Sequence, residues 1–477
     1  MAKHEQVFAY SLAMPIKSRI AYRNANMNTS TVGLSYTVMR PKKTSAITTK
    51  ILETTMPIFN APTHRAVLAA CTALMCSFTL ASPSHATETV RIATLDMSSG
   101  GLAGFGLSAL KHLQFLSEKA NAEQWAGDVR FEIVPFDTKM SPQEALSLLR
   151  QVQSSNIRYV LQGASSSSVG LALEEAIDRH NSRNPGSEIV YINYAAAAPA
   201  MTNEKCSYWH FRTDAHVDMK IKAMMQHLAS NTAIKRVYLF NPNYAYGQES
   251  ARAARQFLTQ LRPDIEIVGD DYHATGQVKD FAPYISKMMQ ARADALVTVS
   301  FGNDLALMVK AANDLGMART QIFTLSGNSP GMAPSFGEKA VGNVLLAGVS
   351  NFNSNTYGAT DLALQYKARM QEDFFFGASE FAMRLLSEGI KTAKSTDPVP
   401  VAAAMSGLTV HTISGPVTMR AQDHQLQTPI YVDVWSAKDG KAVVVDQDNS
   451  GFGWQTQAVI APEQASLPST CQMKRPS

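Results

Sequence analysis

The sequence predicts an α/β fold with two doubly wound lobes. Short runs of β-branched and aromatic residues alternate with stretches that carry apolar residues at helical spacing, which is typical of parallel sheets with helices on both faces. This alternation occurs roughly four times in residues 87–213 and again in residues 214–348. Two separate sheets therefore fit the chain better than one large sheet.

Each half has its own series of strands and helices. In the first half, we expect strands at 90–95, 129–135, 158–162 and 189–193, with helices from about 105, across 145–152 and across 167–180. In the second half, a helix across 217–228 precedes strands at 236–241, 265–271, 295–300 and 322–325, with helices from about 248, 278 and 303.

The C-terminal part follows a different pattern. We expect one or two helices in 360–394 and short strands at 417–419, 430–435 and 441–445, with a hairpin turn at Gly440. Residues 460–477 contain several prolines and few apolar residues, which predicts a loose tail.

Residues near position 80 have the layout of a secretory signal peptide. His64 and Arg65 precede an uncharged apolar run at 66–81, and small residues ending at Ala86 follow a Ser-Pro breaker. The apolar run is too short for a comfortable membrane span. We therefore expect residues 56–86 to be removed by cleavage and the folded chain to work outside the cytoplasm.

The position of this signal within the chain needs an explanation. We interpret residues 1–55, which are rich in Ser, Thr and basic residues, as a non-native upstream extension, with Met56 as the true start. A transit peptide in the same residues is the alternative. A lipoprotein site at Cys71 is disfavoured, because almost no apolar sequence separates it from Arg65.

The basic balance of the chain comes from this leader. The whole chain has 43 basic and 39 acidic residues, and residues 1–86 hold nine and two of them, which leaves 34 and 37. The pI of about 8.7 is therefore no evidence for nucleic-acid binding. Cys206 and Cys471 remain after cleavage, and in an oxidising compartment they are expected to form a disulfide that holds the tail. Two free buried thiols are the alternative.

Three loops that follow strands have compositions suited to a ligand. Residues 100–106 are rich in glycine, although they do not match the dinucleotide-binding pattern, and a turn without a ligand explains them equally well. Residues 163–169 offer four serine hydroxyls at a helix N-terminus, which suit a carboxylate, or else simply cap the helix. Residues 194–199 have small side chains that permit close approach, or tight packing.

No catalytic motif stands out in the sequence. It lacks a G-x-S-x-G elbow, a Walker A loop and an H-E-x-x-H pair, and Asp137, Asp214, Asp280 and Asp304 are spread over different loops. The aromatic run at 374–376 has a helical setting and is expected in the core. The sequence therefore argues against an enzyme.

These segments together carry a family resemblance. From about residue 90 to 445 the chain resembles the type I periplasmic solute-binding proteins of the branched-chain amino acid (Leu/Ile/Val) ABC transporter class. The segments that carry the resemblance are 91–106, 163–168, 198–202, 208–213, 246–248, 279–281 and 413–417. Each segment is short, and it is their order and spacing that make the resemblance specific.

The resemblance implies two Rossmann-like lobes joined by three hinge crossovers, near 211–213, 347–352 and 414–417. The first lobe would comprise 87–213 plus 349–416, and the second 214–348 plus 417–459. A ligand would lie between the lobes at the carboxyl ends of the strands, and the lobes would close on it as a hinge.

The resemblance also implies a set of pocket residues. They are Phe105, Ser166 or Ser167, Ala195, Ala197, Tyr246, Phe301 and Gly327.

Two of these positions depart from the amino-acid binders of the family. Ala197 stands where they have a threonine, and Gly327 stands where they have the acid that pairs with the ligand ammonium. Because a buried ammonium without an acid is costly, we expect a small organic acid or another solute that is not an amino acid. Asn303, Asp304 or Asn328 could replace the missing contacts, which would restore an amino acid or amide.

The resemblance further implies a periplasmic monomer that needs no cofactor or metal and delivers its ligand to an ABC permease in the inner membrane. A ligand-sensing receptor domain of the same fold is the first alternative. An exported α/β enzyme is the second, and it would differ by turning over the compound that it binds.

Overall fold

The computed structural model describes residues 88–101 and 103–476. The predicted signal peptide at 56–86 and the predicted extension at 1–55 lie outside the described residues.

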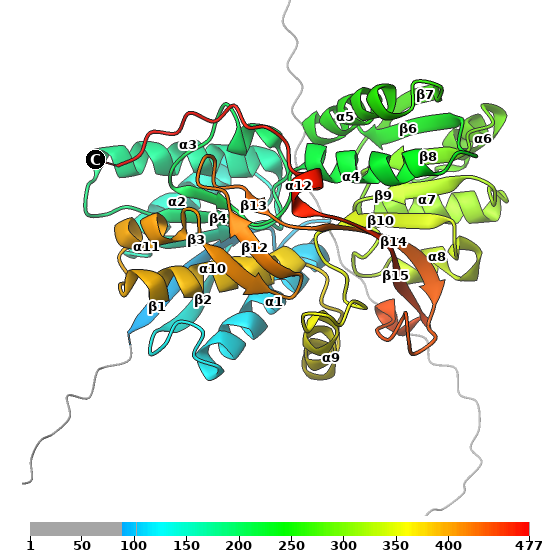
Figure 1. The fold of residues 1–477 in the computed structure, drawn as a ribbon. Helices are drawn as coiled ribbons and strands as arrows, with labels where there is room; N and C mark the ends of the chain where they lie inside the picture. The colour runs from blue at the N-terminus through cyan, green and yellow to red at the C-terminus, as the bar shows by residue number, and fades with distance from the viewer. Residues whose placement is uncertain (1–87, 102, 477) are drawn as a thin grey trace, which may run out of the picture. The chain divides into compact units, whose positions relative to one another are not determined.

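The first sheet has five parallel strands in the order β2-β1-β3-β4-β5 (Figure 1). The strands are β1 (Thr89–Asp96), β2 (Arg130–Asp137), β3 (Tyr159–Gln162), β4 (Val190–Asn193) and β5 (His210–Arg212). Their connections contain α1 (Ala103–Ala122), α2 (Pro142–Ser154), α3 (Ser167–Arg183) and the 3-10 turn η1 (Pro199–Thr202). Every residue of β3 and β4 is buried, as expected for central strands covered on both faces.

The second sheet has seven strands in the order β15-β14-β10-β9-β8-β6-β7. The parallel strands are β6 (Arg236–Pro242), β7 (Glu266–His273), β8 (Ala295–Thr298), β9 (Gln321–Thr324) and β10 (Val344–Gly348). The strands β14 (Ile430–Ala437) and β15 (Phe452–Ile460) add an antiparallel edge. The helices between the parallel strands are α5 (Ala245–Leu261), α6 (Ala282–Gln290), α7 (Gly302–Asp314) and α8 (Ala333–Phe336), with the turn η2 (Glu338–Ala340).

Side-chain alternation along β6 shows why helices cover both faces of the second sheet. Val237 and Leu239 belong to the core that includes the first sheet, and they face the side of α4 (Val217–Ser230) and α5. Tyr238 and Phe240 point the other way, into a separate core that α6, α7 and α8 close. Successive residues of a strand point to opposite faces, so each face needs its own layer of helices.

Among the described residues, three segments link the two sheets: 213–216, 349–376 and 428–429. The middle one contains α9 (Ala359–Met370), after which α10 (Gly377–Ala393) packs against α1, and α11 (Pro398–Met405) packs against α10. Three crossovers were expected, but the third lies later than the predicted 414–417. Residues 409–427 instead form a small antiparallel sheet of β11 (Thr409–Thr412), β12 (Gly415–Met419) and β13 (Leu426–Gln427), which is bridged to β5.

The predicted strand at 441–445 is wrong. These residues form the loop between β14 and β15, which also contains η3 (Gln447–Asn449). The reason is that two side chains accept hydrogen bonds from the backbone N–H groups of the loop, which are therefore not available to a neighbouring strand. Asp439 accepts hydrogen bonds from Lys441 and Val443, and the Asn353 carboxamide oxygen accepts from Val444 and Val445 at 2.8 and 2.7 Å. Besides β10, β14 pairs with β15, a strand that the sequence pattern did not predict.

The C-terminal tail is anchored along its length. It contains α12 (Pro462–Ala465), and the carbonyl of Ser466 accepts a hydrogen bond from Lys222 Nζ on α4. A disulfide joins Cys471 to Cys206, which lies just after η1. Figure 1 shows the tail running from α12 to the marked C-terminus beside α3.

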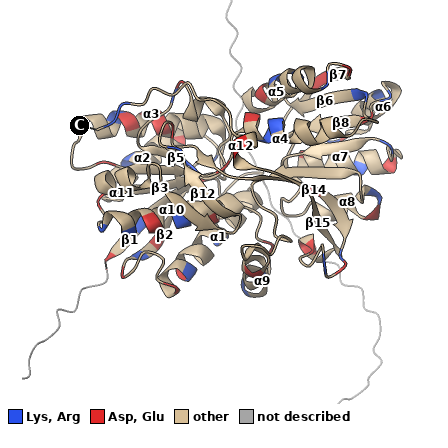
Figure 2. Cartoon of the chain, viewed as in Figure 1, with Lys and Arg blue, Asp and Glu red and all other residues tan. Residues whose placement is uncertain are grey.

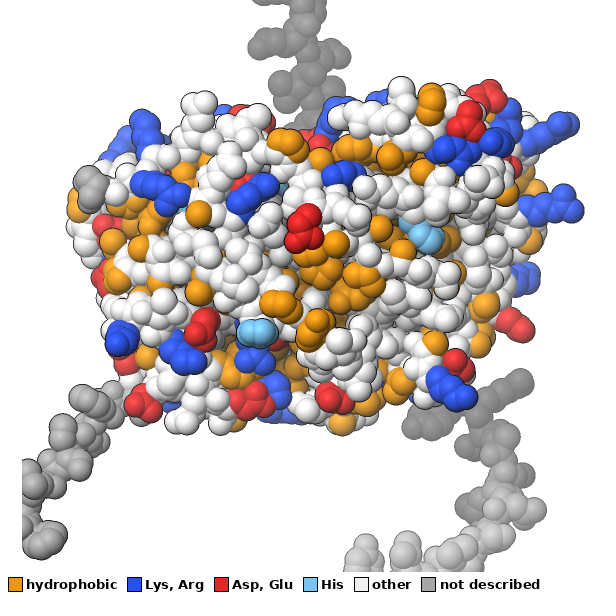
Figure 3. Space-filling view, viewed as in Figure 1, with side chains coloured by type: hydrophobic (Ala, Val, Ile, Leu, Met, Phe, Trp, Pro, Cys, Tyr) orange, Lys and Arg blue, Asp and Glu red, His pale blue; other side chains and the backbone are white. Residues whose placement is uncertain are grey.

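In the view of Figures 2 and 3, charged residues are spread over the surface rather than gathered in one patch. Figure 2 shows acidic and basic residues interspersed along the helices around both sheets. On the face drawn in Figure 3, basic and acidic side chains likewise alternate. In this view there is no continuous basic stripe of the kind that nucleic-acid-binding proteins carry.

Candidate functional site

A cleft of about 770 Å³, part of it open to solvent, lies between the two sheets. Its lining residues follow the carboxyl ends of strands in both sheets. Met97 follows β1, Gly163 follows β3, Phe301 follows β8, and Leu325 follows β9. Parallel α/β sheets bind ligands at this edge, because the loops after neighbouring strands converge there.

Seven of the eight residues predicted to bind ligand line this cleft. They are Phe105, Ser166, Ser167, Ala195, Ala197, Tyr246 and Phe301. The cleft thus combines aromatic rings from both sheets with hydroxyl groups and small side chains from the first sheet.

The serine loop places hydroxyl groups at the start of α3. Ser166 is the N-cap of this helix, and its Oγ accepts a hydrogen bond from the Val169 N–H at 3.3 Å. Ser165 Oγ lies 3.1 Å from Thr138 Oγ1, which fixes the loop to the end of β2. Capping therefore occupies one hydroxyl, and Ser167, the first helical residue, remains at the cleft.

The alanine loop after β4 is shaped by one side chain. Asn193 Oδ1 accepts hydrogen bonds from the N–H groups of Ala195 and Ala196, and its Nδ2 donates to the Ala196 carbonyl at 2.9 Å. This side chain holds the loop in a tight turn. Ala195 and Ala197 then present only methyl groups to the cleft, which leaves room for a ligand.

Behind these two loops lies a closely packed pair. A Cβ at Gly163 would lie 2.5 Å from the Tyr194 ring, so glycine is required there. The Tyr194 hydroxyl donates to the buried Asp96 carboxylate, which also accepts from the Gly163 N–H at 2.8 Å. Burial raises the pKa of Asp96 to about 6.

The second sheet contributes its part of the cleft through another close approach. A Cβ at Gly247 would lie 2.0 Å from the Pro242 carbonyl oxygen, so only glycine lets α5 begin this close to the end of β6. Tyr244 and Tyr246 are thereby held at the cleft. Burial raises the pKa of the Tyr246 hydroxyl, with a smaller effect from Asp214.

Gly327 does not line this cleft. A Cβ at this position would lie 2.7 Å from the Trp454 ring, and the Gly327 carbonyl accepts a hydrogen bond from Gln447 Nε2. The residue thus faces the β14–β15 edge, where a tryptophan fills the space that a larger side chain would need. The Asp304 side chain does not line this cleft either. Its Oδ2 accepts a hydrogen bond from the Gly276 N–H at 2.7 Å.

Sequence reasoning missed a charged pair in the cleft. Asp214 follows β5, Lys220 lies in the first turns of α4, and their Oδ2 and Nζ atoms are 2.6 Å apart. Burial raises the pKa of Asp214, and Lys220 lowers it. Asp214 was noted only as one of several scattered acids. No sequence pattern indicated this pair, because β5, the strand that Asp214 follows, was not among the predicted strands.

A second cavity of about 500 Å³ continues from the cleft and shares Phe105, Asp214, Lys220, Leu325, Ser326 and Phe376 with it. It extends toward Asn328 and Ser350. Asn328 Nδ2 donates to the Phe375 carbonyl at 3.1 Å, so this amide helps to hold the segment before α10.

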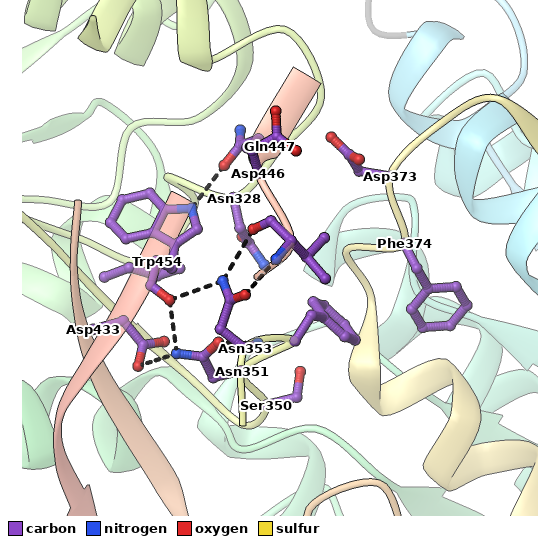
Figure 4. A pocket seen from close by; sticks show the side chains of 13 residues that line it. Asn328, Ser350, Asn351, Asn353, Asp373, Phe374, Asp433, Asp446, Gln447 and Trp454 are labelled. Carbon is purple, nitrogen blue, oxygen red and sulfur yellow. Dashed lines mark hydrogen bonds between the residues drawn. The ribbon is translucent and has the colours of Figure 1, made fainter. Parts of the chain in front are cut away.

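A third cavity, of about 450 Å³, lies beside the 349–353 crossover (Figure 4). Several of its polar groups are bonded to one another. Asn351 Nδ2 donates to Asp433 Oδ1 at 2.7 Å, and Trp454 Nε1 donates to Gln447 Oε1 at 2.7 Å. Asn353 Nδ2 donates to the Trp454 carbonyl. Since these groups already satisfy each other, the cavity is better explained as the polar anchor of a crossover than as a ligand site.

Ser300, His273 and Asp304 have the residue types of a hydrolase triad. Ser300 Oγ lies 2.8 Å from His273 Nε2, but all three side chains are buried, and Ser300 is 0% exposed. His273 Nδ1 lies 3.7 Å from Asp304, too far for a hydrogen bond. A nucleophile must reach its substrate, so this cluster is a structural link between β7, β8 and α7.

Within residues 88–101 and 103–476, no group of three or more His, Cys, Asp or Glu side chains is arranged to hold a metal ion. No helix of that part of the chain is long and apolar enough to span a bilayer.

Comparison with known families gives one clear match. A model described as a periplasmic binding protein family matches residues 89–441. Among curated relatives, the Leu/Ile/Val-binding protein homolog 4 of Brucella abortus (strain 2308) is 26% identical over 400 residues, which cover 82% of this chain and 94% of the relative. The Leu/Ile/Val-binding protein of Escherichia coli (strain K12) is 22% identical over 356 residues, covering 74% and 91%.

Solved structures share the fold. A leucine-, isoleucine-, valine-, threonine- and alanine-binding protein from Brucella ovis, in its closed conformation, aligns with a TM-score of 0.73 at 25% identity, covering 82% of this chain and 100% of that one. A solute-binding protein of an ABC transporter from Rhodopseudomonas palustris, in complex with 3,4-dihydroxybenzoic acid, aligns with a TM-score of 0.67 at 18% identity, covering 78% and 98%.

Proposed function

This chain belongs to the periplasmic binding protein family, and from that premise we propose that it captures a small polar organic molecule, either amino acid-like or an organic acid, and delivers it to an ABC importer. The observation that carries the proposal is the cleft. Residues from both sheets line it, so one bound molecule contacts both sides at once. The curated relatives with names printed as Leu/Ile/Val-binding proteins support the same role.

The lining groups suit a ligand with a polar end and an apolar body. Ser166 and Ser167 offer hydroxyl groups at the N-terminus of α3, which favours a carboxylate. Phe105, Tyr246 and Phe301 offer aromatic surfaces for the rest of the molecule. One neighbour of the same fold is named as a leucine-, isoleucine-, valine-, threonine- and alanine-binding protein, and another is in complex with 3,4-dihydroxybenzoic acid. Both kinds of molecule have a polar end and an apolar body.

The three crossovers provide the mechanism of capture. Two sheets linked by only a few segments can rotate about those segments as a hinge. A ligand that contacts both sides favours the closed form, because only that form makes both sets of contacts. The permease would then distinguish loaded from empty protein by the closed form.

The proposal includes a location. If residues 56–86 act as a cleaved signal peptide, the folded part works in the periplasm, where a monomer meets an importer of the inner membrane. The Cys206–Cys471 disulfide supports an oxidising compartment. Capture without chemical change, rather than catalysis, is the expected outcome of binding.

A thermal-shift screen tests the proposal. The probes are leucine, valine, threonine, benzoate, 4-hydroxybenzoate and succinate, each added to the purified protein. A ligand at about 100 times its Kd stabilises a protein by about 2.7 kcal/mol, and for a folded part of this size the expected rise in Tm is about 3 °C. Recovery of the probe unchanged would separate binding from turnover.

Variants locate the site. Ser167→Ala is expected to weaken binding of the active probe by about 10- to 150-fold, because a hydrogen bond to a charged group is lost. Tyr246→Ala should weaken it further by removing an aromatic wall. Ser182→Ala is the matched control, since this serine is exposed at the far end of α3 and should leave affinity unchanged. Equal affinity in all three variants would place the ligand elsewhere.

A further inference from the structure

One buried carboxylate lies behind the loops through which the first sheet lines the cleft. Asp96 is the last residue of β1, which lies between β2 and β3 in the sheet. The segments that follow β1, β2, β3 and β4 all contribute lining residues, of which Met97, Met140, Gly163 and Ala195 are examples. Asp96 itself is 6% exposed and does not line the cleft, so it can act on a ligand only through these segments.

The Asp96 side chain joins two of these segments. Its Oδ1 accepts a hydrogen bond from the Gly163 N–H at 2.8 Å, where the serine loop (163–169) begins. Its Oδ2 accepts a hydrogen bond from the Tyr194 hydroxyl, where the alanine loop (194–199) begins. The two loops are far apart in the sequence, and this carboxylate is a single group that bonds both of them.

Other contacts transmit the position of Asp96 to the neighbouring segments. The Asp96 carbonyl accepts a hydrogen bond from the Thr138 N–H at 2.8 Å, and Thr138 Oγ1 lies 3.1 Å from Ser165 Oγ in the serine loop. The Tyr194 N–H donates to the Gln162 carbonyl at 3.0 Å, directly before that loop. A displacement of Asp96 would therefore move both loops.

The protonation states of the two side chains suit this arrangement. Burial raises the pKa of Asp96 to about 6, so the carboxylate is ionised at neutral pH and accepts hydrogen bonds at both oxygens. Burial, together with the Asp96 charge, raises the pKa of the Tyr194 hydroxyl well above its usual value, so this hydroxyl remains a donor. A hydrogen bond to an ionised group is stronger than one between neutral groups, which strengthens the link between the loops.

We propose that Asp96 is a positioning residue of the binding cleft, which holds the serine loop and the alanine loop at the separation that a ligand requires. This inference rests on the proposed function and gives Asp96 an effect on affinity that is distinct from its effect on stability. Groups that bind a ligand must be held within about 0.5 Å of their productive positions. Loops that are fixed before the ligand arrives also lose less conformational entropy on binding, which improves affinity.

Three variants remove parts of this link. Asp96→Ala removes both hydrogen bonds, and Tyr194→Phe removes only the hydroxyl, while its ring still packs against Gly163. Asp96→Asn is the conservative variant, because its carboxamide oxygen can accept from the Gly163 N–H and its amide can donate to the Tyr194 oxygen. The probe is whichever of leucine, valine, threonine, benzoate, 4-hydroxybenzoate and succinate binds the wild type most tightly.

Isothermal titration of the purified protein, well below the Tm of every variant, measures the effect on affinity. We expect Asp96→Ala to weaken binding of the probe by about 10- to 100-fold and Tyr194→Phe by about 3- to 10-fold, because the loops no longer keep a fixed separation. Asp96→Asn should remain within about threefold of the wild type. If Asp96→Ala does not fold, the contrast between Tyr194→Phe and Asp96→Asn provides the test.

Tyr159→Phe is the matched control. Tyr159 begins β3 and is 2% exposed, and its hydroxyl donates to the Thr396 carbonyl at 2.7 Å, at the end of the strand away from the cleft. Loss of this hydroxyl should lower the Tm as Tyr194→Phe does, yet leave the affinity for the probe unchanged. A role of Asp96 in stability alone predicts unchanged affinity in all of the folded variants.

Hydrogen exchange of the ligand-free protein gives a second readout. In Asp96→Ala and Tyr194→Phe, the backbone amides of 163–169 and 194–199 should exchange about tenfold faster than in the wild type, because local opening of these loops costs less free energy. The amides of β6 in the second sheet should exchange at the wild-type rate. Tyr159→Phe should leave the exchange of both loops as in the wild type.

Failure of the inference and failure of the proposed function give different results. Wild-type affinity in folded Asp96→Ala and Tyr194→Phe, or an equal loss in Tyr159→Phe, would overturn the inference and leave the proposed solute-binding function intact. Unchanged exchange in both loops would overturn it as well. If none of the probes binds the wild type, the proposed function fails, and the inference fails with it.

Discussion

At the scale of single residues, the cleft depends on close contacts behind its loops. Gly163 has no room for a side chain, because Tyr194 lies against it and is held in place by Asp96. The same loop continues into Ser166 and Ser167, which face the cleft. A change at Gly163 should therefore affect both stability and the position of the hydroxyl groups.

Gly163→Ala tests this connection. The added methyl group would overlap the Tyr194 ring, and overpacking of this kind costs about 1–3 kcal/mol. We expect the Tm to fall by about 1–4 °C and the affinity for the active probe to fall as well, both measured by thermal shift with and without ligand. Gly104→Ala is the control, because a Cβ there meets no atom within 4 Å. A wild-type Tm in Gly163→Ala would show that the ring simply moves aside.

Which site residues can be predicted depends on how the chain positions them. Phe105, Ser167 and Phe301 lie where a helix begins after a strand of the same sheet, so their place follows from the strand pattern and the family resemblance. Lys220 is different, since its helix α4 follows a crossover between the sheets. Its partner Asp214 belongs to a crossover, and the path of a crossover is set by tertiary packing that one sequence does not reveal.

At the scale of elements, strands were predictable where apolar residues dominate. The ranges of β1, β3, β4 and β6 agree with the sequence pattern to within one or two residues. Short polar strands were not predictable. β5 consists of His210, Phe211 and Arg212, and the buried arginine is tolerated because Gln425 Oε1 and the Ala198 carbonyl accept its hydrogens at 2.8 and 2.6 Å. Those partners are distant in the sequence or lie in loops.

A buried acid in β14 predicts a pH dependence. Asp433 accepts hydrogen bonds from Asn351 at 2.7 Å and from Thr456 at 3.0 Å, and burial raises its pKa to about 7. Because the folded pKa exceeds the unfolded value near 3.8, the folded state holds the proton more tightly. This contribution to stability is present below about pH 4 and is lost as the pH rises toward 7, by at most about 1.4 kcal/mol per pH unit.

Asp433→Asn isolates the effect. Asparagine keeps an oxygen that can accept from Asn351 and Thr456 but does not titrate, so we expect the free energy of unfolding to decrease less between pH 5 and pH 8 than in the wild type. Denaturant titrations at several pH values measure it. Asp96, with a pKa near 6, contributes to both curves and cancels in the difference. Asp361→Asn, at an exposed position, should follow the wild type. Parallel curves for Asp433→Asn and wild type would contradict the assignment.

At the scale of the whole folded part, the two sheets are joined by more than their crossovers. The larger core runs from the first sheet into the α4 and α5 side of the second sheet. The tail adds a further link. After β15 it passes α4, where Lys222 donates to the Ser466 carbonyl, and then Ser469 Oγ donates to the Thr202 carbonyl near the first sheet. The Cys206–Cys471 disulfide makes this link covalent.

Removal of the disulfide should therefore destabilise the protein as a whole. The bond closes a loop with a sequence separation of 265 residues, and loss of a native disulfide typically costs roughly 2–5 kcal/mol by relaxing the unfolded chain. In Cys206→Ser/Cys471→Ser we expect the Tm to fall by about 2–6 °C. We also expect proteases to cut the chain sooner after Ile460, because only hydrogen bonds and the packing of residues such as Ala465 and Leu467 then hold the tail. Reductant should lower the Tm of the wild type by a similar amount and leave that of the double variant unchanged. An identical Tm and digestion pattern in wild type and variant would show that the tail is held by its non-covalent contacts, and that the disulfide adds nothing to the link between the sheets.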